Sequence, residues 1–182
     1  MSSALEQLEA LLRDRSVRVG RFVLASGRES DLYVDARQTT LHAVGARLVA
    51  ELMLERLEPE VVAVGGLTMG ADPIACGVSA LSTVHGRPIH AFLVRKEAKT
   101  HGTGNPIEGL GNVPRGSAVA IVEDTTTTGA SLLSAVDAVL AAGLDVVQVL
   151  TVVDREEGAM EALAARGLAL VALTTRSRLV PR

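Results

Sequence analysis

The sequence predicts an α/β fold with a doubly wound, mostly parallel sheet. From residue 61 onward, short apolar runs alternate with segments whose apolar residues recur at helical spacing. The apolar runs are continuous, as expected of parallel strands that helices cover on both faces. The length of 182 residues suits a single domain, residues 1–182, with its own core.

The N-terminal part is predicted to hold two helices and two short strands. Leucines fall on one face of segment 4–14, which predicts a helix. Segments 21–24 and 31–35 resemble strands and flank a Ser-Gly-Arg turn. A helical repeat covers 40–57, with Thr40 as the expected capping residue.

The rest of the chain alternates between predicted strands and helices. Each strand is a short apolar run, and Gly143 and Gly167 end two of the helices. The predicted strands span 61–64, 89–94, 117–123, 146–153 and 168–174, and the predicted helices span 72–84, 130–142 and 156–166.

Composition and charge narrow the class of protein. The net charge of −3 does not favour general nucleic-acid binding. No apolar run approaches the ~20 residues of a membrane span, and the N-terminus lacks the apolar core of a signal peptide. The single cysteine, Cys76, excludes an internal disulfide and is expected to pack. A cytoplasmic protein is therefore predicted.

Polar, glycine-rich or charged sequence follows each of the first four predicted core strands. GGLTMGAD follows the first, RKEAKTHGTGNPIEG the second, EDTTTTGAS the third, and Asp154-Arg155 ends the fourth. In parallel sheets, ligands bind beyond the carboxyl ends of the strands. These four segments are therefore expected to form one site.

EDTTTTGAS, residues 123–131, is the strongest functional signal. A turn rich in threonine and glycine before a helix offers N–H and hydroxyl donors to a phosphate. A phosphate would repel Glu123 and Asp124, so these acids are expected to face a diol or a metal on the same ligand. A ribose 5-phosphate carries both a phosphate and a diol. The alternative is a strand end whose Asp or Thr caps the next helix.

RKEAKTHGTGNPIEG, residues 95–109, gathers the side chains of Arg95, Lys96, Lys99 and His101. Both lysines of the chain lie here, although its other fixed cations are arginines. Lysine is a compact point charge suited to phosphate oxygens. The glycines and proline that follow predict a mobile loop. The alternative is a solvated loop with a chance cluster of charge.

The 123–131 segment resembles the phosphoribosyl pyrophosphate (PRPP) signature of the type I phosphoribosyltransferases. In that family, a strand ending in two acids precedes a loop rich in Thr and Gly. The resemblance implies that Glu123 and Asp124 hold the ribose hydroxyls and that the loop binds the 5-phosphate. The loop residues implied to bind PRPP are Thr125, Thr126, Thr127, Thr128, Gly129, Ala130 and Ser131.

The lysine-bearing segment is similar, more narrowly, to the catalytic loop of orotate phosphoribosyltransferases. The shared pattern is R-K-x-x-K-x-H-G-x-G followed by I-E-G. The resemblance implies that Lys99 and Asp124 are catalytic and that Thr127 and Arg155 bind orotate. The residues of this segment implied to bind PRPP and neutralise pyrophosphate are Arg95, Lys96, Lys99 and His101.

Two further segments fit this family. Residues 26–35, with Ser-Gly, Tyr33 and Asp35, resemble the segment that helps to cover the base, although a plain hairpin would look the same. GGLTMGADPIA, residues 65–75, resembles the pyrophosphate loop of the family, in which its two glycines would expose backbone N–H groups to an anion. The alternative is that this segment is only a tight strand-to-helix turn. One departure is Ala25, where many members carry a lysine.

The resemblance implies an activity and its partners. Orotate and PRPP would give orotidine 5′-monophosphate and pyrophosphate, in the biosynthesis of UMP, with Mg²⁺ carried by PRPP rather than by protein ligands. Residues 1–40, approximately, would form an N-terminal hood, and two chains would form a homodimer with shared active sites. The alternatives are a salvage enzyme for another base and a regulator that binds PRPP without catalysis. Neither nucleic acid nor a membrane is an expected partner.

Overall fold

The computed structural model describes residues 2–23, 29–96 and 106–180. Its centre is a six-stranded sheet in the order β5-β4-β3-β6-β7-β8. All neighbouring strands run parallel except β4 and β5, which are antiparallel. The sheet strands are β3 Ala63–Leu67, β4 His90–Val94, β5 Ile107–Glu108, β6 Ala118–Thr126, β7 Asp145–Asp154 and β8 Leu170–Thr175. The predicted α/β fold with a mostly parallel sheet is confirmed.

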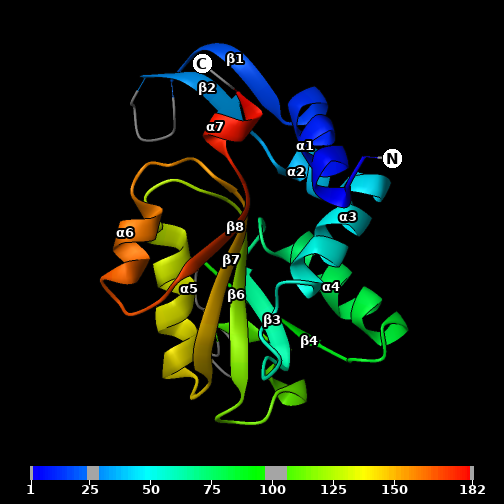
Figure 1. The fold of residues 1–182 in the computed structure, drawn as a ribbon. Coiled ribbons are helices and arrows are strands. Elements are labelled where there is room, and N and C mark those ends of the chain that lie inside the picture. Colours follow the sequence, from blue (N-terminus) through cyan, green and yellow to red (C-terminus); the bar gives the residue numbers. More distant parts are fainter. Residues whose placement is uncertain (1, 24–28, 97–105, 181–182) are drawn as a thin grey trace.

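Helices cover both faces of this sheet (Figure 1). Side chains alternate along β6, so that Ala120 and Val122 pack in one core cluster while Val119 and Ile121 pack in the other. The first cluster joins the sheet to α1, α3 and α4, and the second joins it to α5 and α6. The helices within the described residues are α1 Ala4–Arg15, α2 Arg37–Thr40, α3 Ala43–Leu54, α4 Asp72–Val84, η1 Leu110–Asn112, α5 Ala130–Ala141, α6 Ala159–Ala164 and α7 Arg176–Leu179.

The order of the strands creates a crevice between β3 and β6. The chain moves outward from β3 to β4, then returns to place β6 on the other side of β3. The helices that follow β3 and β6 therefore cover opposite faces of the sheet. A topological switch of this kind leaves an opening beyond the carboxyl ends of the strands, where α/β proteins bind ligands.

A separate antiparallel hairpin lies above this opening (Figure 1). It consists of β1 Val17–Val23 and β2 Glu29–Val34. The backbone N–H of Asp35, just after β2, donates to the Ser16 carbonyl at 2.9 Å. The hairpin agrees with the two predicted N-terminal strands, whereas the single-domain organisation with a hood of about 40 residues stays a prediction.

A buried carboxylate ties the N-terminal helix to the end of the chain. Glu9 of α1 accepts hydrogen bonds from Thr174 Oγ1 at 2.8 Å and from Arg178 Nε at 2.6 Å. Burial alone would raise the pKa of Glu9, but the hydrogen bonds from Arg178 and Thr174 outweigh it and hold the pKa below its usual range. Glu9 thus anchors α1 to β8 and α7 as a charged group.

The predicted helix over 40–57 is wrong at both ends, because α3 covers only Ala43–Leu54. α2 ends at Thr40 and α3 begins at Ala43, after His42 in an extended conformation. Thr40 is therefore not the cap of the long helix, and its side chain is buried. The sequence of α2, Arg-Gln-Thr-Thr, holds no apolar residue, so the apolar pattern could not reveal this short helix or its break from α3.

The two glycines of the predicted pyrophosphate loop lie in a strand instead. Gly65 and Gly66 belong to β3 and pair with β4, and Gly65 also pairs with β6. A Cβ at Gly65 would collide with Phe92, and one at Gly66 would collide with the Val122 carbonyl. These glycines allow close packing around the strand, and the turn itself begins only at Thr68.

Three smaller differences concern the second half of the chain and Cys76. The helix predicted over 156–166 begins at Ala159, because Glu156 and Gly158 both have positive φ. The short strand β5 and helix α7 were not predicted from the sequence. Cys76, expected to pack, is exposed on α4.

Candidate active site

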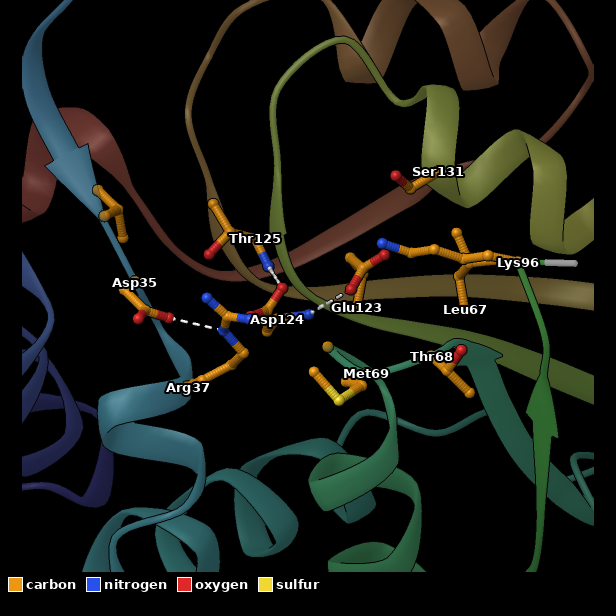
Figure 2. Close-up of a pocket in the computed structure, with 12 residues that line it drawn as sticks. Asp35, Arg37, Leu67, Thr68, Met69, Lys96, Glu123, Asp124, Thr125 and Ser131 are labelled. Carbon is orange, nitrogen blue, oxygen red and sulfur yellow. Dashed lines mark hydrogen bonds and ion pairs between the residues drawn. The ribbon is translucent and has the colours of Figure 1, made fainter. Parts of the chain in front are cut away.

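A cavity of about 450 Å³ opens at the carboxyl ends of β3, β4 and β6. Figure 2 shows its lining, with the acidic pair of β6 between a lysine and an arginine. The lining residues are Val34, Asp35, Arg37, Leu67, Thr68, Met69, Gly70, Lys96, Glu123, Asp124, Thr125 and Ser131. The segments after three of the four predicted strands therefore meet at one site, whereas Asp154 and Arg155 of the fourth do not line it.

Glu123 and Asp124 form a tightly spaced acidic pair near the end of β6. The backbone N–H of Asp124 donates to Glu123 Oε1 at 3.1 Å, and that of Thr125 donates to Asp124 Oδ1 at 2.6 Å. Burial and the neighbouring Asp124 raise the pKa of Glu123 to about 8. Burial also raises the pKa of Asp124. The site thus holds two carboxylates close together in a buried place, where burial and mutual repulsion disfavour their charged forms. This is typical of functional rather than structural carboxylates.

The raised pKa of Glu123, caused by burial and by the neighbouring Asp124, predicts that Glu123→Gln is more stable than the unsubstituted protein at high pH. Between an ordinary carboxyl pKa of 4.5 and about 8, the folded protein holds a proton that the unfolded chain releases. The contribution of Glu123 to stability is therefore present below pH 4.5 and lost as the pH rises toward 8. Glutamine does not ionise, so its contribution is not lost at high pH. Urea unfolding at pH 8.5 should therefore show a free energy of unfolding on the order of 1 kcal/mol greater for Glu123→Gln than for the unsubstituted protein.

Urea unfolding at pH 4.5 should show a smaller gain in the free energy of unfolding for Glu123→Gln, or none. Glu55→Gln is a suitable control, because the Glu55 side chain is exposed at the end of α3. A gain that does not change with pH would contradict the raised pKa of Glu123.

The segment after the acidic pair leads into the N-terminus of α5. Gly129, with φ of 81°, precedes the helix, and no side chain caps it. The capping alternative for Asp124 and the threonines is therefore wrong, since Asp124 accepts from Thr125 instead. Uncapped N–H groups of a helix start are available to an anion. Thr125 Oγ1 is buried and has no hydrogen-bond partner among the described residues, which leaves it available to a ligand.

The structure brings together only part of the predicted site. Lys96, Glu123, Asp124, Thr125 and Ser131 line the cavity. Thr126 is buried in β6 opposite Asp154. Lys99 and His101 lie outside the described residues. The other predicted residues that are described contribute no lining: Arg95, Thr126, Thr127, Thr128, Gly129, Ala130 and Arg155.

The two ends of the 95–109 segment are joined at the edge of the sheet. The backbone N–H of Arg95 donates to the Pro106 carbonyl at 2.8 Å, and β4 pairs with β5. The Arg95 guanidinium forms an ion pair with Glu108 at 2.8 Å. Lys96, the next residue, reaches the cavity on the Glu123 side, and its charge lowers the pKa that burial has raised there.

Arg155 lies at the end of β7, beneath the N-terminal hairpin. Its side chain is buried and forms an ion pair with Glu157 at 3.0 Å. Its Nη2 also donates to the Leu32 carbonyl of β2 at 3.4 Å. The guanidinium is thus held between the hairpin and the end of β7, and it does not line the cavity.

Arg37 is a site residue that the sequence did not reveal. It opens the short helix α2, lines the cavity and forms an ion pair with Asp35 at 2.8 Å. No motif surrounds it, and α2 is too short to give a periodic pattern. Only the fold places it opposite Asp124.

Known proteins resemble this chain over nearly its whole length. Orotate phosphoribosyltransferase of Sorangium cellulosum (strain So ce56) is 47% identical over 182 residues, which cover 99% of this chain and 95% of the relative. The Mycobacterium avium (strain 104) enzyme of the same name is 51% identical over 165 residues, covering 90% and 89%.

A solved structure agrees with this likeness. Orotate phosphoribosyltransferase of Mycobacterium tuberculosis H37Rv in complex with PRPP matches with a TM-score of 0.80 and 42% identity, covering 97% of this chain and 99% of that one. No protein-family model matches. The identities and the coverage decide the question: the chain belongs to the orotate phosphoribosyltransferase family.

Proposed function

We propose that this chain transfers the phosphoribosyl group of PRPP to orotate, giving orotidine 5′-monophosphate and pyrophosphate for pyrimidine biosynthesis. One observation carries the proposal above the others. This chain, a member of the family, places two adjacent carboxylates, an uncapped helix N-terminus and a threonine hydroxyl that is unpartnered among the described residues at one cavity. A sugar diol next to a phosphate matches these groups.

The bound substrates are arranged around the acidic pair. Glu123 and Asp124 accept hydrogen bonds from the ribose hydroxyls, and residues 125–131 donate to the 5-phosphate. The pyrophosphate then leaves C1 of the ribose as a nitrogen of orotate attacks. Positive charge develops on the ribose at this point, and Asp124 steadies it. Arg95, Lys96, Lys99 and His101 neutralise the pyrophosphate as it departs.

Magnesium fits this arrangement as an ion that enters with PRPP. Within the described residues, no three His, Cys, Asp or Glu side chains gather as a protein metal site requires. Mg²⁺ prefers phosphate oxygens, water and one or two carboxylates over a complete protein cage. Glu123 and Asp124 supply hard oxygen atoms at the cavity. When bound, the ion neutralises charge on the phosphates.

The direct test is the consumption of orotate, followed by its absorbance, with PRPP and Mg²⁺. The proposal expects turnover with orotate and none without PRPP. Better turnover with uracil or a purine would identify a salvage enzyme. Binding of PRPP without turnover of any base would identify a regulator.

Arg155→Ala is expected to raise the KM for orotate roughly tenfold or more and to leave the KM for PRPP nearly unchanged. We assign Arg155 and Thr127 to orotate, because a guanidinium can grip its carboxylate through two hydrogen bonds. Arg155→Lys should restore the KM only in part, since a point charge cannot reproduce the fork. Steady-state kinetics for both substrates measure this. Arg87→Ala, which removes an arginine that binds backbone carbonyls elsewhere, is the control. An unchanged KM for orotate in Arg155→Ala would show that Arg155 does not bind the carboxylate of orotate.

We further propose a homodimer that shares its active sites. An apolar pocket of about 510 Å³ adjoins the catalytic cavity and shares Asp35, Arg37 and Met69 with it. Leu41 and Met69, which line it, are 71% and 67% exposed. Exposed apolar patches of this kind favour a protein partner. A second copy on this surface would bring its own chain to the edge of the site.

Mixing two impaired variants tests the shared sites. Lys99→Ala and Asp124→Asn should each retain about a tenth of the activity or less, because one lacks the loop lysine and the other lacks the ribose carboxylate. If the loop acts on the neighbouring subunit, random reassociation gives half mixed dimers with one intact site each, or about a quarter of the full activity. No recovery after complete exchange of subunits would exclude the shared arrangement.

A cytoplasmic location is also proposed, on the sequence evidence given above. None of the described helices is long and apolar enough to cross a membrane.

A further inference from the structure

The cavity that must accept a polyanion carries more acidic than basic side chains among the described residues. Asp35, Glu123 and Asp124 all line it, and the cations that line it within the described residues are Arg37 and Lys96. The turn after β3, residues 68–70, carries no charged side chain. Gly70 also leaves no room for one, because a Cβ there would collide with Glu123 and lie 2.7 Å from Asp124 Oδ1. PRPP brings further negative charge. Each cation at this cavity therefore matters to binding.

Arg37 is held in place before any ligand binds. Its Nε donates to Asp35 Oδ1 at 2.8 Å. Helix α2 is itself anchored, because the buried Thr39 hydroxyl lies 2.7 Å from the Ser16 hydroxyl. Asp35 and then Asp124 raise the pKa of Arg37, so its charge is secure. Among the described residues, its two terminal amino groups have no hydrogen-bond partner, and its side chain is 43% exposed.

The position of Arg37 selects the part of the substrate that it can meet. Figure 2 shows Arg37 on the Asp124 side of the acidic pair, while Ser131 and Lys96 lie on the Glu123 side. With the ribose over the acidic pair and its 5-phosphate beside Ser131 at the N-terminus of α5, the substituent at C1 points away from Ser131 and toward Asp124 and Arg37. Arg37 is then the lining cation on that side within the described residues, whereas Lys96 reaches the same substituent from across the acidic pair. That substituent is pyrophosphate. Two terminal amino groups of a guanidinium match two phosphate oxygens.

We propose that Arg37 contacts the pyrophosphate group of PRPP as a substrate-binding residue, and that Asp35 positions its guanidinium. The proposal rests on the function proposed above. It gives the site a cation that comes from the N-terminal segment rather than from the 95–109 segment. It also gives the Asp35–Arg37 ion pair a role beyond stability.

The test compares Arg37→Gln, Arg37→Lys and Asp35→Asn with the unsubstituted enzyme in both directions of the reaction. Arg37→Gln should raise the KM for PRPP, and the KM for pyrophosphate in the reverse reaction, roughly tenfold to a hundredfold. The KM for orotate and for orotidine 5′-monophosphate should change less than about twofold. Arg37→Lys should recover part of the loss, and Asp35→Asn should raise the KM for PRPP less than Arg37→Gln does.

Arg166→Gln is the matched control. Arg166 is 42% exposed and pairs with Asp137 at 2.5 Å, but it follows α6 away from the cavity. Its variant should keep every KM. Sedimentation of each variant shows whether the oligomeric state has changed, since Arg37 also lines the apolar pocket.

The outcomes separate this proposal from the function itself. An unsubstituted enzyme that does not consume orotate refutes the proposed function. Normal turnover with an Arg37→Gln variant that keeps its KM for PRPP and pyrophosphate refutes the role of Arg37 alone. A rise confined to orotate would show that Arg37 holds the carboxylate of the base, which also overturns the pyrophosphate contact.

Discussion

Replacing Lys99 with alanine is expected to lower kcat by about a hundredfold or more, with a much smaller change in the binding of PRPP. The lysine is proposed to neutralise pyrophosphate as it leaves, when the negative charge on the departing group is greatest. A group whose interaction strengthens in the transition state affects kcat more than ground-state binding. Losses of this size follow the removal of one charge-stabilising donor. Steady-state and single-turnover kinetics measure the effect.

Lys99→Arg provides the comparison, since it keeps the charge but changes its shape. It should recover part of kcat. An unchanged kcat for Lys99→Ala would remove this residue from the reaction, and an equal rise in KM alone would assign it to ground-state binding.

Replacing Asp124 with asparagine is expected to weaken PRPP binding and turnover together, each by roughly tenfold or more. Asparagine retains an oxygen that can accept the hydrogen bond from the Thr125 N–H, so the local fold should survive. It removes the charge that faces the ribose. Calorimetry with PRPP and kinetics with saturating orotate measure the two effects.

Asp137→Asn serves as the control, because Asp137 lies on α5 in an exposed ion pair with Arg166. PRPP affinity that is unchanged in Asp124→Asn would place the ribose away from the end of β6. A loss of folding, seen as a fall in Tm beyond that of the control, would be read separately from the loss of binding.

The sheet was predictable from the sequence because a strand buried on both faces is a continuous run of apolar residues. Residues 119–122 are continuously apolar because alternate side chains enter two different core clusters. The acids at the end of β6 interrupt that run, which marked them as functional. Lys96 and Ser131 could be placed with them because all of these residues follow parallel strands.

The details that failed depend on contacts between distant segments. The sequence predicts a loop at Gly65 and Gly66, but close contact with the side chain of Phe92 and the carbonyl of Val122 places them in β3. Cys76 lies in an apolar sequence but on an exposed face of α4. Arg37 could not be recognised either, because its importance arises from its place at the cavity near Asp124, which is distant in the sequence.

The Glu9 anchor has a consequence for the order in which the protein folds. Glu9 and Thr174 are separated by 165 positions, and Arg155 and Leu32 by 123. Contacts this far apart form late, because closing long loops carries an entropic cost that only the completed core offsets. During synthesis, α1 emerges first, but its carboxylate finds its partners only after β8 and α7 have left the ribosome. The Arg155–Leu32 hydrogen bond, which joins the hairpin to the end of β7, can form earlier, because both residues precede β8 and α7 in the chain.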